Sequence, residues 1–219
     1  MALADYEQLF TCEQTLNRAH NQHLLKMLDS LFAQADLQPT DVALVAFGCG
    51  PGSFTGVRIA AAVTQAIAFA SGAMVLPVAS SRVLALTACW QQPSLSRWVC
   101  CIHSRGEAYY LAAYAAEQNN RVDLACLQPD ELVDSPPAWL RAEMGASLIG
   151  TMPRWLPASI EPAISENLQP SAEAMVEWAR RAHQRGESLP AAQALPTYVA
   201  GDSPWRKRGA PNALREKGR

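Results

Sequence analysis

The glycine-rich segment Gly48–Arg58 is the part of the chain whose residue types and spacing could do chemistry. It reads GCGPGSFTGVR, follows an apolar run and precedes a helical pattern, and in such a turn backbone N–H groups can bind a phosphate. It lacks the Lys of a Walker A loop and the third Gly of the dinucleotide fingerprint, and Ser53 is too close to Gly52 for a nucleophile elbow. Two interpretations stay open. The segment is an anion-binding loop, or it is a tight turn in which Ser53 or Thr55 caps the helix.

The other reactive side chains do not form a recognisable set. His20 and His23 could share one helix face as metal ligands, but the sequence brings no third ligand near them. His103 could act as a base, but no nucleophile accompanies it. The basic cluster at residues 206–208 could contact RNA phosphate, although a short basic tail is more often simply solvated. We therefore predict no catalytic residue, no metal site and no cofactor.

The composition narrows the class of protein. The 219 residues are 49% hydrophobic and 17% charged, with a formal net charge of −2. These values exclude a wholly disordered chain and a global basic field that would recruit nucleic acid. The six cysteines form no C-x-x-C pair, which favours reduced thiols in the cytosol. The first ten residues do not resemble a signal peptide, and Arg58 interrupts the longest apolar stretch. We expect a soluble, cytoplasmic protein without a membrane span.

The first part of the chain predicts alternating helices and strands. Residues 2–16 contain strand material, and apolar residues at a three-four spacing predict an amphipathic helix over residues 17–35. Apolar runs at residues 42–47 and 74–78 predict buried strands. The small residues of 55–70 predict a helix that is buried on two sides, and Ser80 or Ser81 is predicted to cap another helix that ends near Trp90. This order favours an α/β fold.

The pattern changes after Pro93. Residues 97–103 and 107–115 predict a hairpin, and the proline-rich stretch from 129 to 170 holds at most a short helix near 137–143 and a strand at 147–151. A helix follows, from Pro170 to about Arg185. We predict an N-terminal lobe at residues 1–92, a C-terminal lobe at 93–200 and a basic tail at 201–219.

The glycine-rich turn resembles the signature of a known family. The pattern G-x-G-P-G-S-F-T-G-[VL]-R-[IV], here at residues 48–59, is similar to that of the TsaB (YeaZ-like) proteins. Four further segments resemble the same family: 17–20 with the helix that follows, 74–81, 102–110 and 195–207. The resemblance covers nearly the whole chain.

The resemblance implies an α/β fold of the actin/sugar-kinase/Hsp70 class with two ribonuclease-H-like lobes. It also implies a non-catalytic subunit that is required for threonylcarbamoyladenosine modification of tRNA at the adenosine next to the anticodon. Such a subunit dimerises with the catalytic TsaD-type paralogue and activates it, a TsaE-type ATPase joins the complex, and tRNA is contacted indirectly. The sequence leaves open whether the chain homodimerises alone. The alternative is a nucleotide-binding phosphotransferase or carbamoyltransferase of the same fold that acts on its own.

In the family, the helices at 17–35 and 55–70 form the partner interface, and the signature turn shapes it. A helix with small residues on all sides that lies beside an amphipathic helix is suited to a helix-bundle interface. We expect the partner-binding residues to be His20, Leu24, Met27, Leu31, Gly52, Ser53, Phe54, Thr55, Gly56, Arg58, Ala62 and Gln65.

The chain departs from the family pattern in two places. Family members begin with a strand that residues 1–4 do not match, so we expect roughly a dozen or more N-terminal residues to be missing. A wrongly chosen start codon explains this most simply. In the hairpin turn, His103 replaces the family's Asp, and one residue between Arg105 and Gly106 is absent.

Overall fold

The computed structural model describes residues 1–5, 8–14, 20–117, 120–141, 143, 145–156 and 168–199. The first residues of the helix predicted at 17–35, which are 17–19, and the basic tail at 201–219 lie outside these residues. Strands β1 (Ala2–Ala4) and β2 (Leu9–Thr11) form an antiparallel hairpin, and helix α1 (His20–Ala35) packs against both of them. Within the described part of the chain, this hairpin is separate from the other two sheets.

A short parallel sheet carries the glycine-rich turn. Strand β3 (Leu44–Gly50) pairs with β4 (Met74–Ala79), and helix α2 (Phe54–Ser71) connects them and packs against β3. Two parallel strands need such a crossover, because the chain must return to the end of the sheet at which the first strand began. The turn thus leads directly from the end of β3 into α2.

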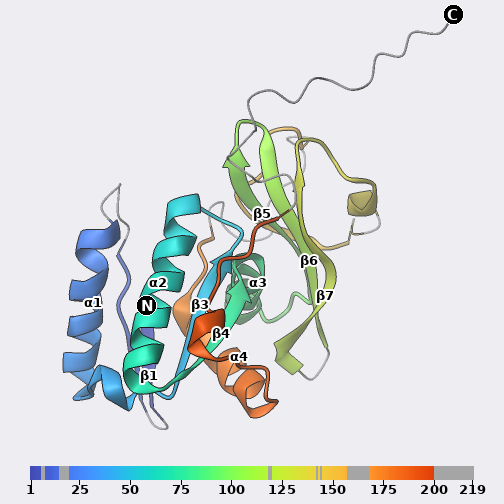
Figure 1. Cartoon of the computed structure of the whole chain (residues 1–219). Coiled ribbons are helices and arrows are strands. Elements are labelled where there is room, and N and C mark those ends of the chain that lie inside the picture. Colours follow the sequence, from blue (N-terminus) through green and yellow to red (C-terminus); the bar gives the residue numbers. More distant parts are fainter. Residues whose placement is uncertain are drawn as a thin grey trace, which may run out of the picture.

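The second half of the described chain forms a four-stranded sheet in the order β7-β6-β5-β8. Its strands are β5 (Arg97–Arg105), β6 (Ala108–Glu117), β7 (Asn120–Val133) and β8 (Ser147–Gly150), and β8 is parallel to β5. Helix α3 (Ser80–Gln91) packs against both sheets and against α4 (Ala172–Gln184). Figure 1 shows α1 and α2 at one end of the molecule and the four-stranded sheet at the other.

The main core surrounds α3. Leu84, Ala85 and Ala88 on this helix are buried against Trp98 and Ile149 of the four-stranded sheet. A smaller core lies between α2 and the β3–β4 pair, where Phe47 and Val75 pack with small helix residues. Burial of these apolar side chains holds α2 against the sheet of β3 and β4.

Most predicted elements are confirmed, but β7 was missed. The predicted cap of α3 by Ser80 or Ser81 is wrong, because Ala79 occupies the N-cap position and no side chain caps the helix. The helices predicted at 17–35, 55–70 and 170–185 and the strands at 42–47, 74–78, 97–103 and 147–151 are present with shifted ends. β7 contains Pro129, which argues against a central strand. Pro129 is tolerated because β7 lies at the edge of its sheet, with irregular pairing to β6. The prediction that α2 is buried on two sides is wrong, since one of its faces is exposed.

Gly150, at the end of β8, provides a test of the fold. Its φ is +90°, and a Cβ there would lie 2.3 Å from the carbonyl oxygen of Cys101. We expect Gly150→Ala to lower the free energy of unfolding by about 2–4 kcal/mol, because both the backbone conformation and the clash are unfavourable. Gly145→Ala is the control, since a Cβ there meets nothing within 4 Å. Equal stability of the two variants in urea unfolding would contradict this packing.

Candidate functional site

The turn after β3 is in close contact with the C-terminal segment of the described chain. The backbone N–H of Thr197 donates to the carbonyl oxygen of Cys49 at 2.8 Å. Gly50 has a φ of +119°, and a Cβ at this position would lie 2.7 Å from the Thr197 carbonyl oxygen. A glycine is therefore required here by both the backbone conformation and the close approach.

Ser53 caps α2, which confirms the capping interpretation of this residue. Its side-chain oxygen accepts a hydrogen bond from the backbone N–H of Gly56 at 3.3 Å. At the other end, Gly72 takes the left-handed conformation that commonly ends a helix. The Ser53 hydroxyl thus satisfies one of the N–H groups that the first helical turn leaves without a partner.

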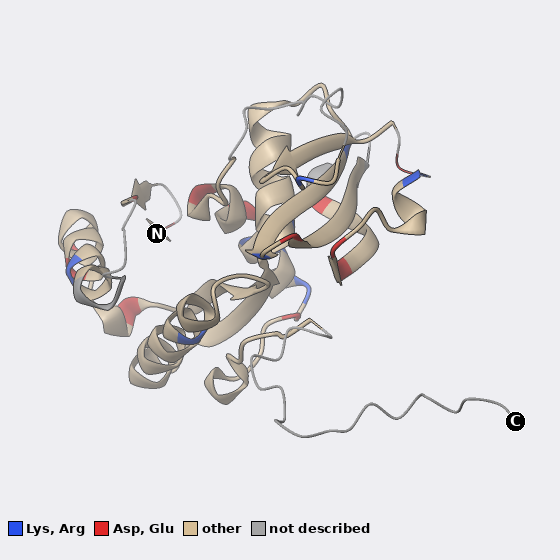
Figure 2. Ribbon diagram, turned by 90° about the horizontal axis from the view of Figure 1, so that it is seen from above, with Lys and Arg blue, Asp and Glu red and all other residues tan. Residues whose placement is uncertain are grey.

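The two faces of α2 have different environments. Val57, Ala61, Thr64 and Ala68 are buried inside the chain. The opposite face is exposed; we define the outer face of α2 by its exposed residues Thr55, Arg58, Ala62, Ala66, Phe69 and Ala70. Arg58 is the one charged residue of α2, and Figure 2 shows this helix almost wholly in tan. The outer face therefore carries a single charge, and its residues other than Thr55 and Arg58 are apolar.

The composition of α2 is unusual for a helix with so exposed a face. Among the helices of the described residues, α2 alone is long and apolar enough to cross a membrane by length and composition, with a hydropathy of 1.3 and 22% of it buried. One such helix is a weak indication of a membrane span, because helices of soluble proteins pass the same criterion. An exposed apolar surface also marks a protein–protein interface.

The predicted partner-binding residues of α2 come together around its outer face. Ser53, Thr55, Arg58 and Ala62 are exposed, and Gly52, Phe54 and Gly56 are half-buried. Gln65 points back into the chain, where its Nε2 donates to the Ala194 carbonyl oxygen at 3.1 Å.

The predicted partner-binding residues of α1 are less accessible. Leu24 and Met27 are half-buried, and Leu31 is 2% exposed. The backbone of His20 begins α1, but its side chain lies outside the described part of the structure. Leu25, which was not among the predicted residues, is a large apolar residue of this helix and is 60% exposed.

Two residues of this surface were missed by the sequence analysis. Phe69 is 66% exposed at the C-terminal end of the outer face, and Tyr198 lies beside Arg58. A large apolar residue among alanines was the available signal for Phe69. Tyr198 is far from α2 in sequence, so no local pattern connects the two.

A cavity of about 590 Å³ lies beside the turn. Its lining includes Cys49, Asp130, Glu131 and Thr197, and the described lining residues include no Lys or Arg. Burial raises the pKa of Asp130 from 3.8 to about 6. The Ser81 hydroxyl donates to Oδ2 of Asp130 at 2.8 Å. The Oδ1 of Asp130 is buried and has no hydrogen-bond partner within the described structure.

The cavity offers no activated nucleophile among its described residues. Burial raises the pKa of the Cys49 thiol, which keeps it protonated and unreactive. Carboxylates without nearby cations also repel phosphate groups. The geometry therefore does not favour a nucleotide polyphosphate in this cavity.

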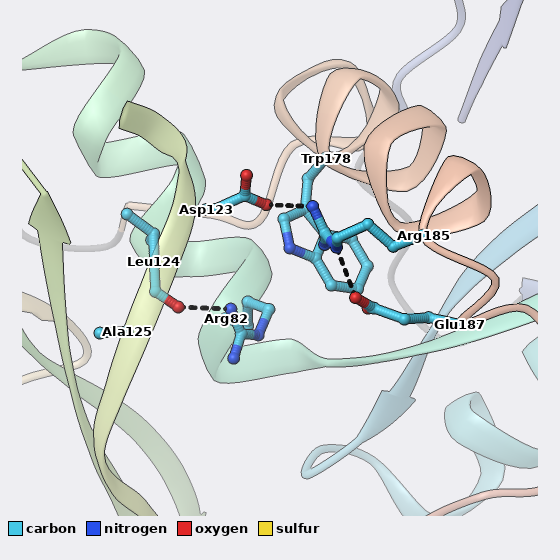
Figure 3. A pocket seen from close by; sticks show the side chains of 7 residues that line it. All are labelled: Arg82, Asp123, Leu124, Ala125, Trp178, Arg185 and Glu187. Carbon is cyan, nitrogen blue, oxygen red and sulfur yellow. Dashed lines mark hydrogen bonds and ion pairs between the residues drawn. The ribbon is translucent and has the colours of Figure 1, made fainter. Parts of the chain in front are cut away.

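A second cavity, of about 460 Å³, lies between α4, α3 and β7 (Figure 3). Its charged groups are already engaged. Arg82 donates to the Leu124 carbonyl oxygen at 2.8 Å, and Arg185 pairs with Asp123 at 2.8 Å and with Glu187. The Arg82 guanidinium also lies 5.5 Å from the ring of Trp178. This cluster ties α4 to β7 and indicates a structural role.

The described residues contain no group of three or more His, Cys, Asp or Glu that could hold a metal ion. His23 and His103 are therefore not part of such a group within the described residues. The Nε2 of His103 lies 3.1 Å from the Gly106 carbonyl oxygen, and its ring contacts Tyr109. Its surroundings are those of a hydrogen-bonded residue at the end of a strand.

Comparison with known proteins identifies the class. The family model "TsaD: tRNA N6-adenosine threonylcarbamoyltransferase" matches residues 14–146, more than half of the chain. A crystal structure from Pseudomonas aeruginosa, described as an uncharacterized protein with similarity to peptidase YEAZ, is 30% identical with a TM-score of 0.79, covering 90% of this chain and 92% of its own. The structure of YeaZ from the same organism is 29% identical, with a TM-score of 0.72 over the same shares. The fold is thus the actin/sugar-kinase/Hsp70-like α/β fold.

Curated relatives narrow the assignment. The "tRNA threonylcarbamoyladenosine biosynthesis protein TsaB" of Escherichia coli K12 is 28% identical over 199 residues, which cover 87% of this chain and 84% of that protein. The TsaB of Haemophilus influenzae Rd is 26% identical over 200 residues, with the same shares. The chain therefore belongs to the TsaD family, in which its relatives are the TsaB (YeaZ-like) proteins.

Asp130 predicts a pH dependence of stability. The folded protein holds the Asp130 proton up to a pKa of about 6, whereas the unfolded chain loses it near pH 4. Stability should therefore fall as the pH rises from 4 to 7, by at most about 3 kcal/mol. Urea unfolding at pH 4.5 and 7.5 measures the change. The free energy of unfolding of Asp130→Asn should decrease less between these two pH values than that of the wild type. The exposed Asp29→Asn serves as control, and an identical pH dependence of all three proteins would contradict the prediction.

Proposed function

We propose that this chain is a non-catalytic, cytoplasmic subunit of tRNA threonylcarbamoyladenosine biosynthesis. It binds a TsaD-type transferase and activates it, and a TsaE-type ATPase acts with the pair. The observation that carries the proposal is the exposed, apolar outer face of α2. The names of the relatives supply the pathway.

The outer face has the properties of a surface that another protein covers. Ala62 and Ala66 expose small side chains in the middle of the helix, which lets a second helix approach closely. Phe69 adds a large apolar group at one end, of the kind that anchors interfaces. Burying these side chains against a partner removes apolar surface from water, which favours association.

The described residues also support a role without chemistry of its own. They include no metal-binding group, and the cavity beside the turn is lined by Asp130 and Glu131 rather than by cations. The alternative, a nucleotide-binding phosphotransferase or carbamoyltransferase, requires groups that neutralise phosphate charge. The Pseudomonas neighbour is described as similar to a peptidase; in this chain His183 and Ser188 are hydrogen-bonded at 2.9 Å, but the pair is exposed and does not line the cavity beside the turn.

Ala62→Trp tests the assignment of the outer face. Ala62 is exposed, so the substitution should leave the fold intact. At a helix–helix interface the bulky ring cannot be accommodated, and we expect the dissociation constant for the TsaD-type protein of the same organism to rise about 10-fold or more. Titration calorimetry and size-exclusion chromatography measure this.

Ala125→Trp is the matched control for Ala62→Trp. Ala125 is exposed on β7, a strand of the four-stranded sheet and not of the sheet that packs against α2. Its replacement should change the affinity by less than about two-fold. Unchanged binding of Ala62→Trp would show that the partner does not cover the outer face.

Phe69→Ser tests the anchor at the end of the same face. Truncating an exposed aromatic that a partner buries should weaken binding about 10-fold or more. Trp90 is similarly exposed, at 59%, but lies at the end of α3, and Trp90→Ser should bind normally. A stronger effect of Trp90→Ser than of Phe69→Ser would place the interface elsewhere.

A further inference from the structure

Arg58 is the single charged residue of the largely apolar outer face of α2. It is exposed and is the one charged residue of α2. The ion pairs formed among the described residues involve other arginines, and none includes Arg58. Its side chain is therefore positioned on the outer face without a carboxylate from the described part of the chain.

Two aromatic rings hold the Arg58 guanidinium in place. Its central carbon lies 3.3 Å from the centroid of the Phe54 ring and 5.5 Å from that of Tyr198. Phe54 is one helical turn before Arg58, so the two side chains are neighbours on the helix surface. Cation–π contacts use the flat faces of the guanidinium and leave its N–H edge able to donate hydrogen bonds.

Tyr198 reaches this position because the C-terminal segment is fixed to the turn and to α2. The Thr197 backbone N–H is hydrogen-bonded to Cys49, and Gln65 is hydrogen-bonded to the Ala194 carbonyl oxygen. The rings of Phe54 and Tyr198 lie 6.2 Å apart at an angle of 41°. A constrained guanidinium loses less conformational entropy when it binds, which favours a specific contact.

We propose that Arg58, held by Phe54 and Tyr198, receives an aspartate or glutamate carboxylate of the partner protein that covers the outer face of α2. The inference rests on the proposed function and names the chemistry of the partner's contact. A partner that buried this guanidinium without a counter-charge would leave an uncompensated ion, which is strongly unfavourable. A carboxylate fits the N–H edge of a guanidinium in a two-point hydrogen-bonded pair.

A protein carboxylate is favoured over a nucleic-acid phosphate by the surroundings of Arg58. Toward the C-terminal end of α2, the outer face continues from Arg58 through Ala62, Ala66 and Phe69, which offer apolar surface. Nucleic-acid backbones are bound by several cations together, and α2 offers one. The same face thus provides a large apolar contact and a single charged contact, as in protein interfaces.

The test measures binding of the full chain to the TsaD-type protein of the same organism, without tRNA. Arg58→Ala should raise the dissociation constant about 30-fold, as expected for loss of one partner of a buried charge pair. Arg58→Glu should weaken binding further, and Arg58→Lys should restore part of the affinity. Tyr198→Leu should give an intermediate loss, because the guanidinium is then less constrained.

Arg154→Glu is the charge-matched control. The Arg154 side chain is 74% exposed and lies in the part of the chain after β8, so the variant should bind within about two-fold of the wild type. Circular dichroism verifies that each variant is folded. The decisive result is rescue of Arg58→Glu by an Asp or Glu to Arg substitution in the partner.

The outcomes separate this inference from the proposed function. Normal binding by Arg58→Glu, together with lost binding by Ala62→Trp, would overturn the role of Arg58 and leave the outer face as the interface. Normal binding by both variants, or no binding by the wild type, would overturn the proposed function and this inference with it. An effect of Arg58 that requires added tRNA would assign the contact to a phosphate and overturn the carboxylate.

Discussion

Covering the apolar surface of α2 is the constraint on which the rest of the structure depends. One face of the helix is buried against β3 through Val57, Ala61, Thr64 and Ala68. Because most of these residues are small, the helix lies close to the strand. The other face remains exposed in the isolated chain. The fold thus uses the helix once for its own core and leaves it available for a second contact.

The C-terminal segment limits how the turn and α2 can move relative to each other. It touches the turn where Gly50 leaves no room for a side chain, and it accepts a hydrogen bond from Gln65 at Ala194. Cys49 and Thr197, which are 148 positions apart in the sequence, are therefore joined close to the start of α2. An interface built on this region is more rigid than one built on a free helix, which lowers the entropic cost of association.

The sequence was sufficient for the local parts of this arrangement. Apolar periodicity located α1 and α2, and the glycine-rich turn indicated the family and narrowed the cap of α2 to Ser53 or Thr55, of which the structure shows Ser53. It was insufficient where tertiary contacts decide. Pro129 argued against a strand that is tolerated at a sheet edge, and the small residues of α2 suggested burial on two sides because periodicity cannot show whether a second neighbour belongs to the same chain. The position of Tyr198 beside Arg58 depends on a long-range contact that no local pattern encodes.

The outer face and the cavity beside the turn differ in charge and polarity. This difference favours binding of a protein at the outer face over binding of an anionic substrate in the cavity. The cavity holds carboxylates and a protonated thiol, a poor environment for anionic substrates. The outer face holds apolar groups and one constrained cation, a good environment for a protein surface. Apolar contact supplies affinity without discriminating strongly between partners, whereas a single buried charge rejects any partner that lacks its complement. In the proposed interface, Arg58 therefore supplies the discrimination between partners, and the apolar residues of the outer face supply the affinity.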